Sequence, residues 1–281
     1  MSELTVAVLQ FCPGIDQERN LKTAGRLLAQ ASFRGTRLAV LPEMFSRFLP
    51  AAKWRENAEE TGGAVEKFLA EQALANRIYL VGGSYVEKTA EGEYFNTCAV
   101  FTPEGQLAGR YRKMHLFWTD IPGRTRYDER SYLSAGEGRF SFDADGFRVE
   151  VGICYDLRFP EFFRPSGGKP ADIFCLPSAF MEATGAAHWA SLVRARAIEN
   201  LAYFAAADTA GTHFDVAERP GEKVKTWGHS MVVGPWGNIL GQVDSGEGMA
   251  VAEISHGDIA RARAKLAALE HIRDDLWPKR H

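Results

Sequence analysis

The sequence predicts one α/β domain in which two β-sheets pack face to face and helices cover the outside. Three observations support this prediction. Short apolar, β-branched runs alternate with segments of helical periodicity, a similar order of elements occurs in both halves of the 281-residue chain, and no linker separates the halves. Sheets and helices that are apolar on one side must bury those sides together, which favours a layered sandwich.

The first half reads as strand, helix, strand, helix and strand, followed by a hairpin. Asp16 is a candidate N-cap for the first helix, whose apolar residues recur at helical spacing. The strand at 37–41 is almost continuously apolar, which is typical of a strand buried on both faces of a sheet. The predicted strands are Thr5–Gln10, Arg37–Leu41, Ile78–Tyr85, Tyr94–Phe101 and Gln106–Lys113, and the predicted helices are Gln17–Arg34 and Gly63–Asn76.

The second half follows a similar pattern of alternating strands and helices. Its predicted strands are Phe140–Phe142, Phe147–Ile153, Ala171–Leu176, Leu201–Ala207, His229–Val233, Asn238–Val243 and Met249–Ile254, and its longer helices are His188–Asn200 and Asp258–Leu269. Three stretches, 46–62, 118–138 and 210–226, read as long irregular loops, which in a compact domain usually carry function. We expect residues 1–270 to form a single domain. The tail 271–281 contains Trp277, an apolar residue that we expect to contact a neighbouring subunit.

Composition excludes several classes of protein. With 46% apolar residues the chain can form a sizeable core, and a net charge of −3 without a basic run argues against nucleic acid or an anionic membrane as partner. No apolar run is long enough to span a bilayer, and the N-terminus shows no signal peptide. Four cysteines without CxxC spacing fit a reducing cytoplasm, and the histidines form no cluster with metal-ligand spacing.

Cys154 lies where a predicted strand meets a predicted helix. Pro160 fits the first turn of a helix that begins near Phe159. A thiol at such a corner lies near free backbone N–H groups and a helix N-terminus, conditions that favour the thiolate and an oxyanion site. An isolated cysteine at the end of a strand is more often a small apolar core residue, so the functional interpretation depends on the rest of the chain.

Two other predicted strands end in residues that would complete a nucleophilic site. Glu43 follows the strand at 37–41, and Lys113 ends the strand at 106–113. Either charge alone would be an ordinary surface group. Because ligands in sheets of this class lie beyond the carboxyl ends of the strands, we expect these side chains to meet Cys154 in one pocket. A carboxylate, an ammonium group and a thiol suffice for covalent acyl transfer.

Three segments of the sequence resemble the motifs of a known enzyme superfamily. Leu41-Pro42-Glu43, Tyr111-Arg112-Lys113-Met114-His115-Leu116 and Gly152-Ile153-Cys154-Tyr155-Asp156-Leu157-Arg158-Phe159 resemble, in this order, the Glu, Lys and Cys motifs of the nitrilase (carbon–nitrogen hydrolase) superfamily. The likeness covers nearly the whole chain and is strongest to omega-amidases and deaminated glutathione amidases. It implies a four-layer α-β-β-α sandwich, a homodimer and a reaction without a cofactor.

The resemblance also implies a role for each residue of the motifs. Glu43 would be the general base and acid, and Cys154 would be the nucleophile. Lys113 would hold the tetrahedral oxyanion together with the backbone N–H of Tyr155. The superfamily has a second glutamate in the loop after the lysine, and Glu129 occupies that place. Glu137, in the same loop, is the alternative.

Two further residues are candidates for substrate binding. Arg158 either forms a surface salt bridge with Asp156 or Glu161, or binds a substrate carboxylate through its guanidinium, as the resemblance to relatives with carboxylate-bearing substrates implies. Phe180 matches a pocket-lining position of the same relatives, and ordinary core packing is an equally good interpretation.

The sequence therefore predicts a cytoplasmic amidase. It would hydrolyse the terminal amide of a small carboxylate-bearing amide, such as 2-oxoglutaramate or deaminated glutathione, through a thioester acyl-enzyme. A broader aliphatic or N-carbamyl amidase is the alternative within the superfamily. Two readings from other classes are a non-catalytic interaction protein, which has no use for Glu43, Lys113 and Cys154 together, and a papain-like Cys–His hydrolase, for which no histidine motif is present.

Overall fold

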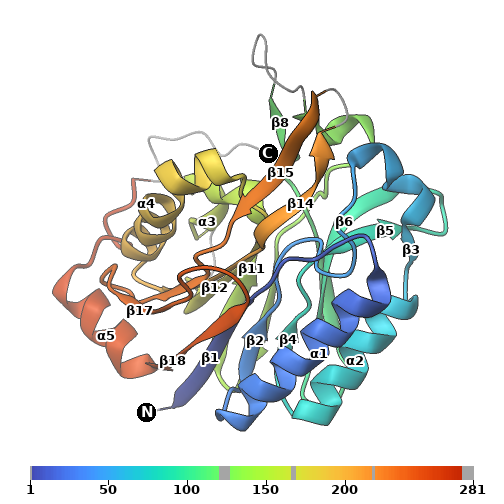
Figure 1. The fold of residues 1–281 in the computed structure, drawn as a ribbon. Helices are drawn as coiled ribbons and strands as arrows, with labels where there is room; N and C mark the ends of the chain where they lie inside the picture. Colours follow the sequence, from blue (N-terminus) through green and yellow to red (C-terminus); the bar gives the residue numbers. More distant parts are fainter. Residues whose placement is uncertain (1, 120–126, 166–168, 217–218, 274–281) are drawn as a thin grey trace.

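The computed structural model describes residues 2–119, 127–165, 169–216 and 219–273. Two β-sheets stack face to face between two layers of helices (Figure 1). Helices α1 (Gln17–Phe33) and α2 (Ala64–Asn76) cover one sheet, and α3 (Pro160–Phe163) and α4 (Glu182–Asn200) cover the other. The predicted α-β-β-α sandwich is confirmed.

The first sheet has eight strands in the order β18-β1-β2-β4-β6-β5-β3, with β7 paired to β6. Strands β1, β2 and β4 are parallel to one another, so their carboxyl ends lie at one edge of the sheet. The strands of this sheet are β1 (Glu3–Gln10), β2 (Leu38–Val40), β3 (Glu59–Glu60), β4 (Tyr79–Val81), β5 (Tyr85–Lys88), β6 (Tyr94–Phe101), β7 (Leu107–Arg112) and β18 (Gly248–Ser255).

The second sheet has six strands in the order β10-β11-β12-β13-β16-β17. Its central strands β11, β12 and β13 are also parallel, and their carboxyl ends again share one edge. The strands are β10 (Phe140–Ala144), β11 (Phe147–Val151), β12 (Ile173–Ser178), β13 (Tyr203–Asp208), β16 (Met231–Val233) and β17 (Ile239–Gln242).

Alternation along the strands creates the main core. In β1, Val6 and Val8 belong to the core shared with the second sheet, whereas Ala7 and Leu9 belong to the core beneath α1 and α2. This period of two lets one strand support two apolar layers. Full burial of each Val or Leu side chain contributes on the order of 1.5–3 kcal/mol, so the inner strands are the stable frame on which the loops are mounted.

The prediction of a single strand at Ile78–Tyr85 is wrong, because the structure has two strands there. β4 ends at Val81 and β5 begins at Tyr85, on the far side of β6. Gly83 between them has a φ of 63°, and a Cβ there would lie 2.3 Å from the carbonyl oxygen of Pro42. Only glycine fits this close approach to the segment that carries Glu43.

The stretch 210–226, expected to be irregular, is a hairpin of β14 (Ala210–Val216) and β15 (Arg219–Trp227). Most of its residues are polar or glycine, so the sequence contains no apolar periodicity that would predict a strand. In the described residues of the other two stretches, the regular elements are short strands and 3-10 turns. Helix α4 begins at Glu182 rather than at His188, and α5 (His256–Lys265) ends before Leu269.

Trp277, which we expected to contact a neighbouring subunit, lies outside the described residues. In the part of the chain that the structure describes, no helix combines the length and the apolar character that crossing a membrane requires.

Candidate active site

The predicted site residues lie close together at the ends of three strands. Glu43 follows β2, Lys113 follows β7, and Cys154 lies just beyond β11. The backbone N–H of Glu43 donates to the carbonyl oxygen of Ser178 at the end of β12 (3.3 Å), and that of Lys113 donates to Asn96 on β6 (2.9 Å). The site therefore lies where the carboxyl ends of both sheets meet, as expected for an α/β fold.

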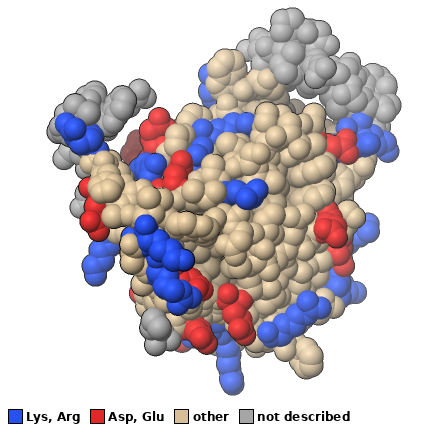
Figure 2. Space-filling model, turned by 90° about the vertical axis from the view of Figure 1, so that its left-hand side faces the viewer, with Lys and Arg blue, Asp and Glu red and all other residues tan. Residues whose placement is uncertain are grey.

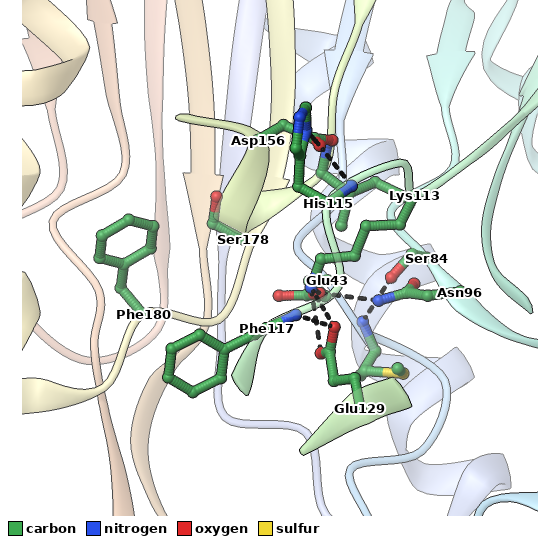
Figure 3. A network of polar contacts seen from close by, with 12 residues as sticks. Glu43, Ser84, Asn96, Lys113, His115, Phe117, Glu129, Asp156, Ser178 and Phe180 are labelled. Carbon is green, nitrogen blue, oxygen red and sulfur yellow. Dashed lines mark hydrogen bonds and ion pairs between the residues drawn. The ribbon is translucent and has the colours of Figure 1, made fainter. Parts of the chain in front are cut away.

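The ammonium group of Lys113 lies between two carboxylates (Figure 3). Its Nζ donates to Glu43 Oε1 and to Glu129 Oε1, each at 3.0 Å, and its side chain is 1% exposed. Burial alone would lower the pKa of Lys113, but the carboxylates of Glu129 and Glu43 raise this pKa well above its ordinary value. Lys113 is therefore a permanent cation rather than a base.

Glu129 is the second glutamate that the structure brings to Lys113. It opens a 3-10 turn (Glu129–Ser131) and also accepts the backbone N–H of Phe117 at 2.7 Å (Figure 3). Burial raises the pKa of the Glu129 carboxyl, and the Lys113 ammonium opposes this rise. The alternative, Glu137, is exposed to solvent, so the geometry favours Glu129.

The Glu43 carboxylate has several partners within the site. Oε1 accepts from Lys113 Nζ and from the Asn96 side-chain amide at 2.8 Å (Figure 3). The carboxylate also interacts with the thiol of Cys154, whose pKa it raises, so it is placed to take the thiol proton. The sequence analysis missed Asn96. Its signal is a polar residue in the middle of a buried strand.

Cys154 occupies a sharp corner between β11 and a 3-10 turn (Cys154–Arg158), with a φ of 46°. Such left-handed backbone costs a non-glycine residue on the order of 1–3 kcal/mol and is concentrated at functional sites. Burial and then the Glu43 carboxylate raise the pKa of the thiol well above its ordinary value, while Lys113 and the backbone N–H of Ala179 lower it. The corner was expected to favour the thiolate, whereas burial and the Glu43 carboxylate act in the opposite direction, so the thiol depends on a base.

Asp156 is another residue whose role the sequence did not predict. Its buried carboxylate accepts the backbone N–H of Ile153 (2.8 Å), the hydroxyl of Tyr111 (2.7 Å) and the backbone N–H of His115 (3.1 Å). It thereby joins the nucleophile turn to the segment after Lys113. His115 Nδ1 also lies 2.7 Å from Asp156, and the ring stacks on Phe159, so this histidine is not placed as the base of a Cys–His pair.

Arg158 and Phe180 are neighbours. The guanidinium lies 5.2 Å from the centre of the Phe180 ring and 5.9 Å from that of Tyr155, and its Nη1 is 3.3 Å from His188 Nδ1. Among the residues that the structure describes, no carboxylate forms an ion pair with Arg158. The salt bridges to Asp156 or Glu161 that we considered are therefore absent there. Phe180 is also buried against Trp189.

In the described part of the chain, no group of three or more His, Cys, Asp or Glu residues is arranged to hold a metal ion. The chemistry available at the site is that of a thiol, two carboxylates and an ammonium group.

Comparison with known proteins identifies the family of this chain. The sequence profile described as carbon–nitrogen hydrolase matches residues 5–264. The chain belongs to this family. It is accordingly a hydrolase acting on carbon–nitrogen bonds, and the predicted resemblance to the nitrilase superfamily is confirmed.

Individual relatives agree over almost the whole chain. Omega-amidase NIT2-B of Xenopus laevis is 36% identical over 279 residues, which cover 99% of this chain and 98% of the relative. Omega-amidase NIT2 of Homo sapiens is 35% identical, again over 99% and 98% of the two chains. The crystal structure of Saccharomyces cerevisiae Nit3, a member of branch 10 of the nitrilase superfamily, superposes with a TM-score of 0.82 at 30% identity, covering 94% of each chain.

Proposed function

We propose that this protein is a cysteine-dependent amidase that hydrolyses the terminal amide of a small, carboxylate-bearing amide. The substrate class is that of 2-oxoglutaramate or deaminated glutathione, and the products are the free acid and ammonia. The observation that carries the proposal is Cys154 on its left-handed corner beside the Glu43 carboxylate, with Lys113 held between Glu43 and Glu129. The relatives named omega-amidases support the choice of substrate class.

In the acylation step, Glu43 takes the thiol proton as the sulfur of Cys154 attacks the amide carbon. The carbonyl π electrons move to oxygen, and Lys113 Nζ with the backbone N–H of Tyr155 stabilises the oxyanion. When the tetrahedral state collapses, the carbon–nitrogen bond breaks. Glu43 then gives its proton to the departing nitrogen, which leaves as ammonia, and a thioester remains on Cys154.

In the deacylation step, Glu43 accepts a proton from a water molecule that attacks the thioester. The same oxyanion donors act again, the carbon–sulfur bond breaks, and the thiol of Cys154 regains its proton from Glu43. Glu129 holds the ammonium group of Lys113 in place through both steps, opposite Glu43. No step requires a metal or an organic cofactor.

Arg158 is the proposed carboxylate-binding residue. Its guanidinium has no carboxylate partner in the described ranges, and it lies over the rings of Phe180 and Tyr155 near the nucleophile turn. A guanidinium in this setting can bind a substrate carboxylate with two parallel hydrogen bonds. Phe180 would form the apolar wall beneath it.

We also propose that the enzyme is a cytoplasmic homodimer. Figure 2 views the side on which α4, α5 and β17 lie in Figure 1, and this face has a broad area without charged residues. Ile198 of α4 is 43% exposed, and Trp236 of the β16–β17 turn is 58% exposed. A contiguous exposed apolar patch is typical of a contact between proteins. A reducing cytoplasm suits cysteines that are all free among the described residues.

An ammonia-release assay over 2-oxoglutaramate, deaminated glutathione, glutamine, an N-carbamyl amino acid and propionamide tests the proposal. We expect the 2-oxo acid amides to be hydrolysed best and Cys154→Ala to abolish their hydrolysis. Arg158→Leu should remove most of this activity while any slow hydrolysis of propionamide survives. Preferred hydrolysis of neutral or N-carbamyl substrates would instead identify the broader amidase, and equal losses on both kinds of substrate would give Arg158 a structural role.

A further inference from the structure

Asp208, the last residue of β13, is a buried carboxylic acid that the proposed steps do not use. Its side chain is fully buried, and its two oxygens contact different segments. Oδ1 accepts the backbone N–H of Phe180 (2.8 Å), and Oδ2 accepts that of Gly228 (2.9 Å). Burial raises the pKa of this carboxyl, and the two backbone donors oppose the rise. Asp208 therefore joins the chain beyond β12 to the chain beyond β15.

The segment 178–180 that Asp208 holds touches the active site at each of its three residues. The carbonyl oxygen of Ser178 accepts the backbone N–H of Glu43 at 3.3 Å. The backbone N–H of Ala179 lowers the pKa of the Cys154 thiol, so it lies on the side of the sulfur. The ring of Phe180 lies under the guanidinium of Arg158. A shift of this short segment would therefore displace contacts of the base, the nucleophile and the substrate-binding arginine.

We propose that Asp208 is a positioning residue that acts through the N–H of Phe180 to hold the segment 178–180, with the N–H of Ala179, in place beside Glu43 and Cys154. When Glu43 removes the thiol proton, negative charge develops on the sulfur, and a correctly placed N–H stabilises it. The inference rests on the proposed roles of Cys154 and Glu43. Hydrogen bonds to charged groups contribute enough to change a rate by roughly 10- to 100-fold.

A purely electrostatic role for Asp208 predicts a different result from a positioning role. If Asp208 is ionised, the change to Asn removes a negative charge that disfavours the thiolate, so Cys154 should react faster. If Asp208 is neutral, the change alters no charge. Asp208 also interacts with the charge of Glu43, so a change of charge would act on the base as well as on the thiol. Asp208→Glu keeps the charge and therefore separates the two roles. In Asp208→Asn, an N–H₂ group must face one of the two backbone N–H groups, which displaces the segment and slows the thiol.

The test compares Asp208→Asn and Asp208→Glu with a matched control, Asp172→Asn. Asp172 precedes β12 at the opposite end of the sheet, and its carboxylate likewise accepts a backbone N–H, that of Arg148, at 3.0 Å. The alkylation rate of Cys154 by iodoacetamide is followed by peptide mass spectrometry, with the exposed Cys12 as an internal standard. The kcat and KM for ammonia release are measured on the same proteins.

We expect both Asp208 variants to slow alkylation of Cys154 and to lower kcat by roughly 10- to 100-fold, with KM and the alkylation of Cys12 within about threefold of wild type. Asp172→Asn should change none of these values by more than about threefold. Asp208→Glu keeps the charge, so its slower alkylation would reflect position alone.

Three results would overturn the inference. These are alkylation of Cys154 in Asp208→Asn at the wild-type rate or faster, an equal loss in Asp172→Asn, or failure of both Asp208 variants to fold at 25 °C while the control folds, which would make Asp208 a structural residue only. A wild-type enzyme that releases no ammonia from any substrate would contradict the proposed function instead. It would leave the comparison of alkylation rates intact.

Discussion

Lys113 and the two carboxylates beside it are almost fully removed from water, an arrangement that is costly for each charge taken alone. Burial, and then the Glu43 carboxylate, raise the pKa of the nearby thiol of Cys154. The sequence motifs predicted that these residue types would meet. They could not predict the direction in which the pKa of the thiol shifts, because that depends on burial and on charges distant in sequence.

Lys113→Met tests the cation at this cluster. We expect kcat to fall by at least about 10²–10³ with a smaller effect on KM, because the ammonium group acts mainly on charge that develops in the tetrahedral state. Removing one partner of a buried ion pair should also lower the free energy of unfolding by roughly 3–5 kcal/mol. Steady-state kinetics and urea denaturation measure the two effects.

Arg112→Met is the matched control for Lys113→Met. Arg112 precedes Lys113 in the sequence, but its guanidinium pairs with Glu87 (2.9 Å) and not with the active-site cluster. This variant should lose stability and keep kcat within about threefold of wild type. A Lys113→Met enzyme with unchanged kcat and a raised KM would assign Lys113 to substrate binding.

At the scale of elements, the strand ends were more predictable than the turns that follow them. The strands predicted at 37–41, 106–113 and 147–153 correspond to β2, β7 and β11, and they placed Glu43, Lys113 and Cys154 at strand ends. The hairpin of β14 and β15 was missed because its residues are largely polar and show no apolar periodicity. The single strand predicted at 78–85 failed at Gly83, where a close backbone approach decides the path.

Asp156→Asn tests how the nucleophile turn is held. Asp156 joins this turn to Tyr111 and His115, and an amide cannot accept hydrogen bonds at both oxygen positions. We expect the free energy of unfolding to fall by about 2–3 kcal/mol and kcat to fall about tenfold or more. Chemical denaturation and ammonia release measure these changes.

Asp143→Asn is the control for the Asp156 variant. Asp143 also accepts a backbone N–H, that of Gly146 (2.8 Å), but in an exposed turn. Its loss should cost about 0.5 kcal/mol or less and leave kcat unchanged. If Asp156→Asn were as stable and active as this control, the link between the two segments would have no catalytic importance.

At the scale of the whole molecule, the active site exists only because the two sheets pack together. Glu43 and Lys113 come from the first sheet, Cys154 comes from the second, and the contact between Glu43 and Ser178 joins them. The repeated order of elements predicted the two packed sheets. It could not identify Asn96, Asp156 or Asp208, whose roles depend on contacts between segments distant in sequence.

This arrangement makes Glu43→Gln the decisive variant. The neutral amide keeps the size of the side chain, so the sheets should still pack, but it cannot take the thiol proton. Turnover should fall by about 10²–10⁴, the usual contribution of general acid–base catalysis. Because the Glu43 carboxylate raises the pKa of Cys154, its removal should lower that pKa and speed alkylation near neutral pH. Faster alkylation would show that the thiol itself remains intact.

The most direct test of the account is the intact mass of Glu43→Gln after incubation with substrate, measured beside its turnover. Exposed Glu137→Gln serves as a control that should behave like wild type. We predict slow turnover together with an acyl adduct on Cys154, because both formation and hydrolysis of the thioester need the same carboxylate. Near-normal turnover without an adduct would contradict the assignment of Glu43, Lys113 and Cys154 as a whole.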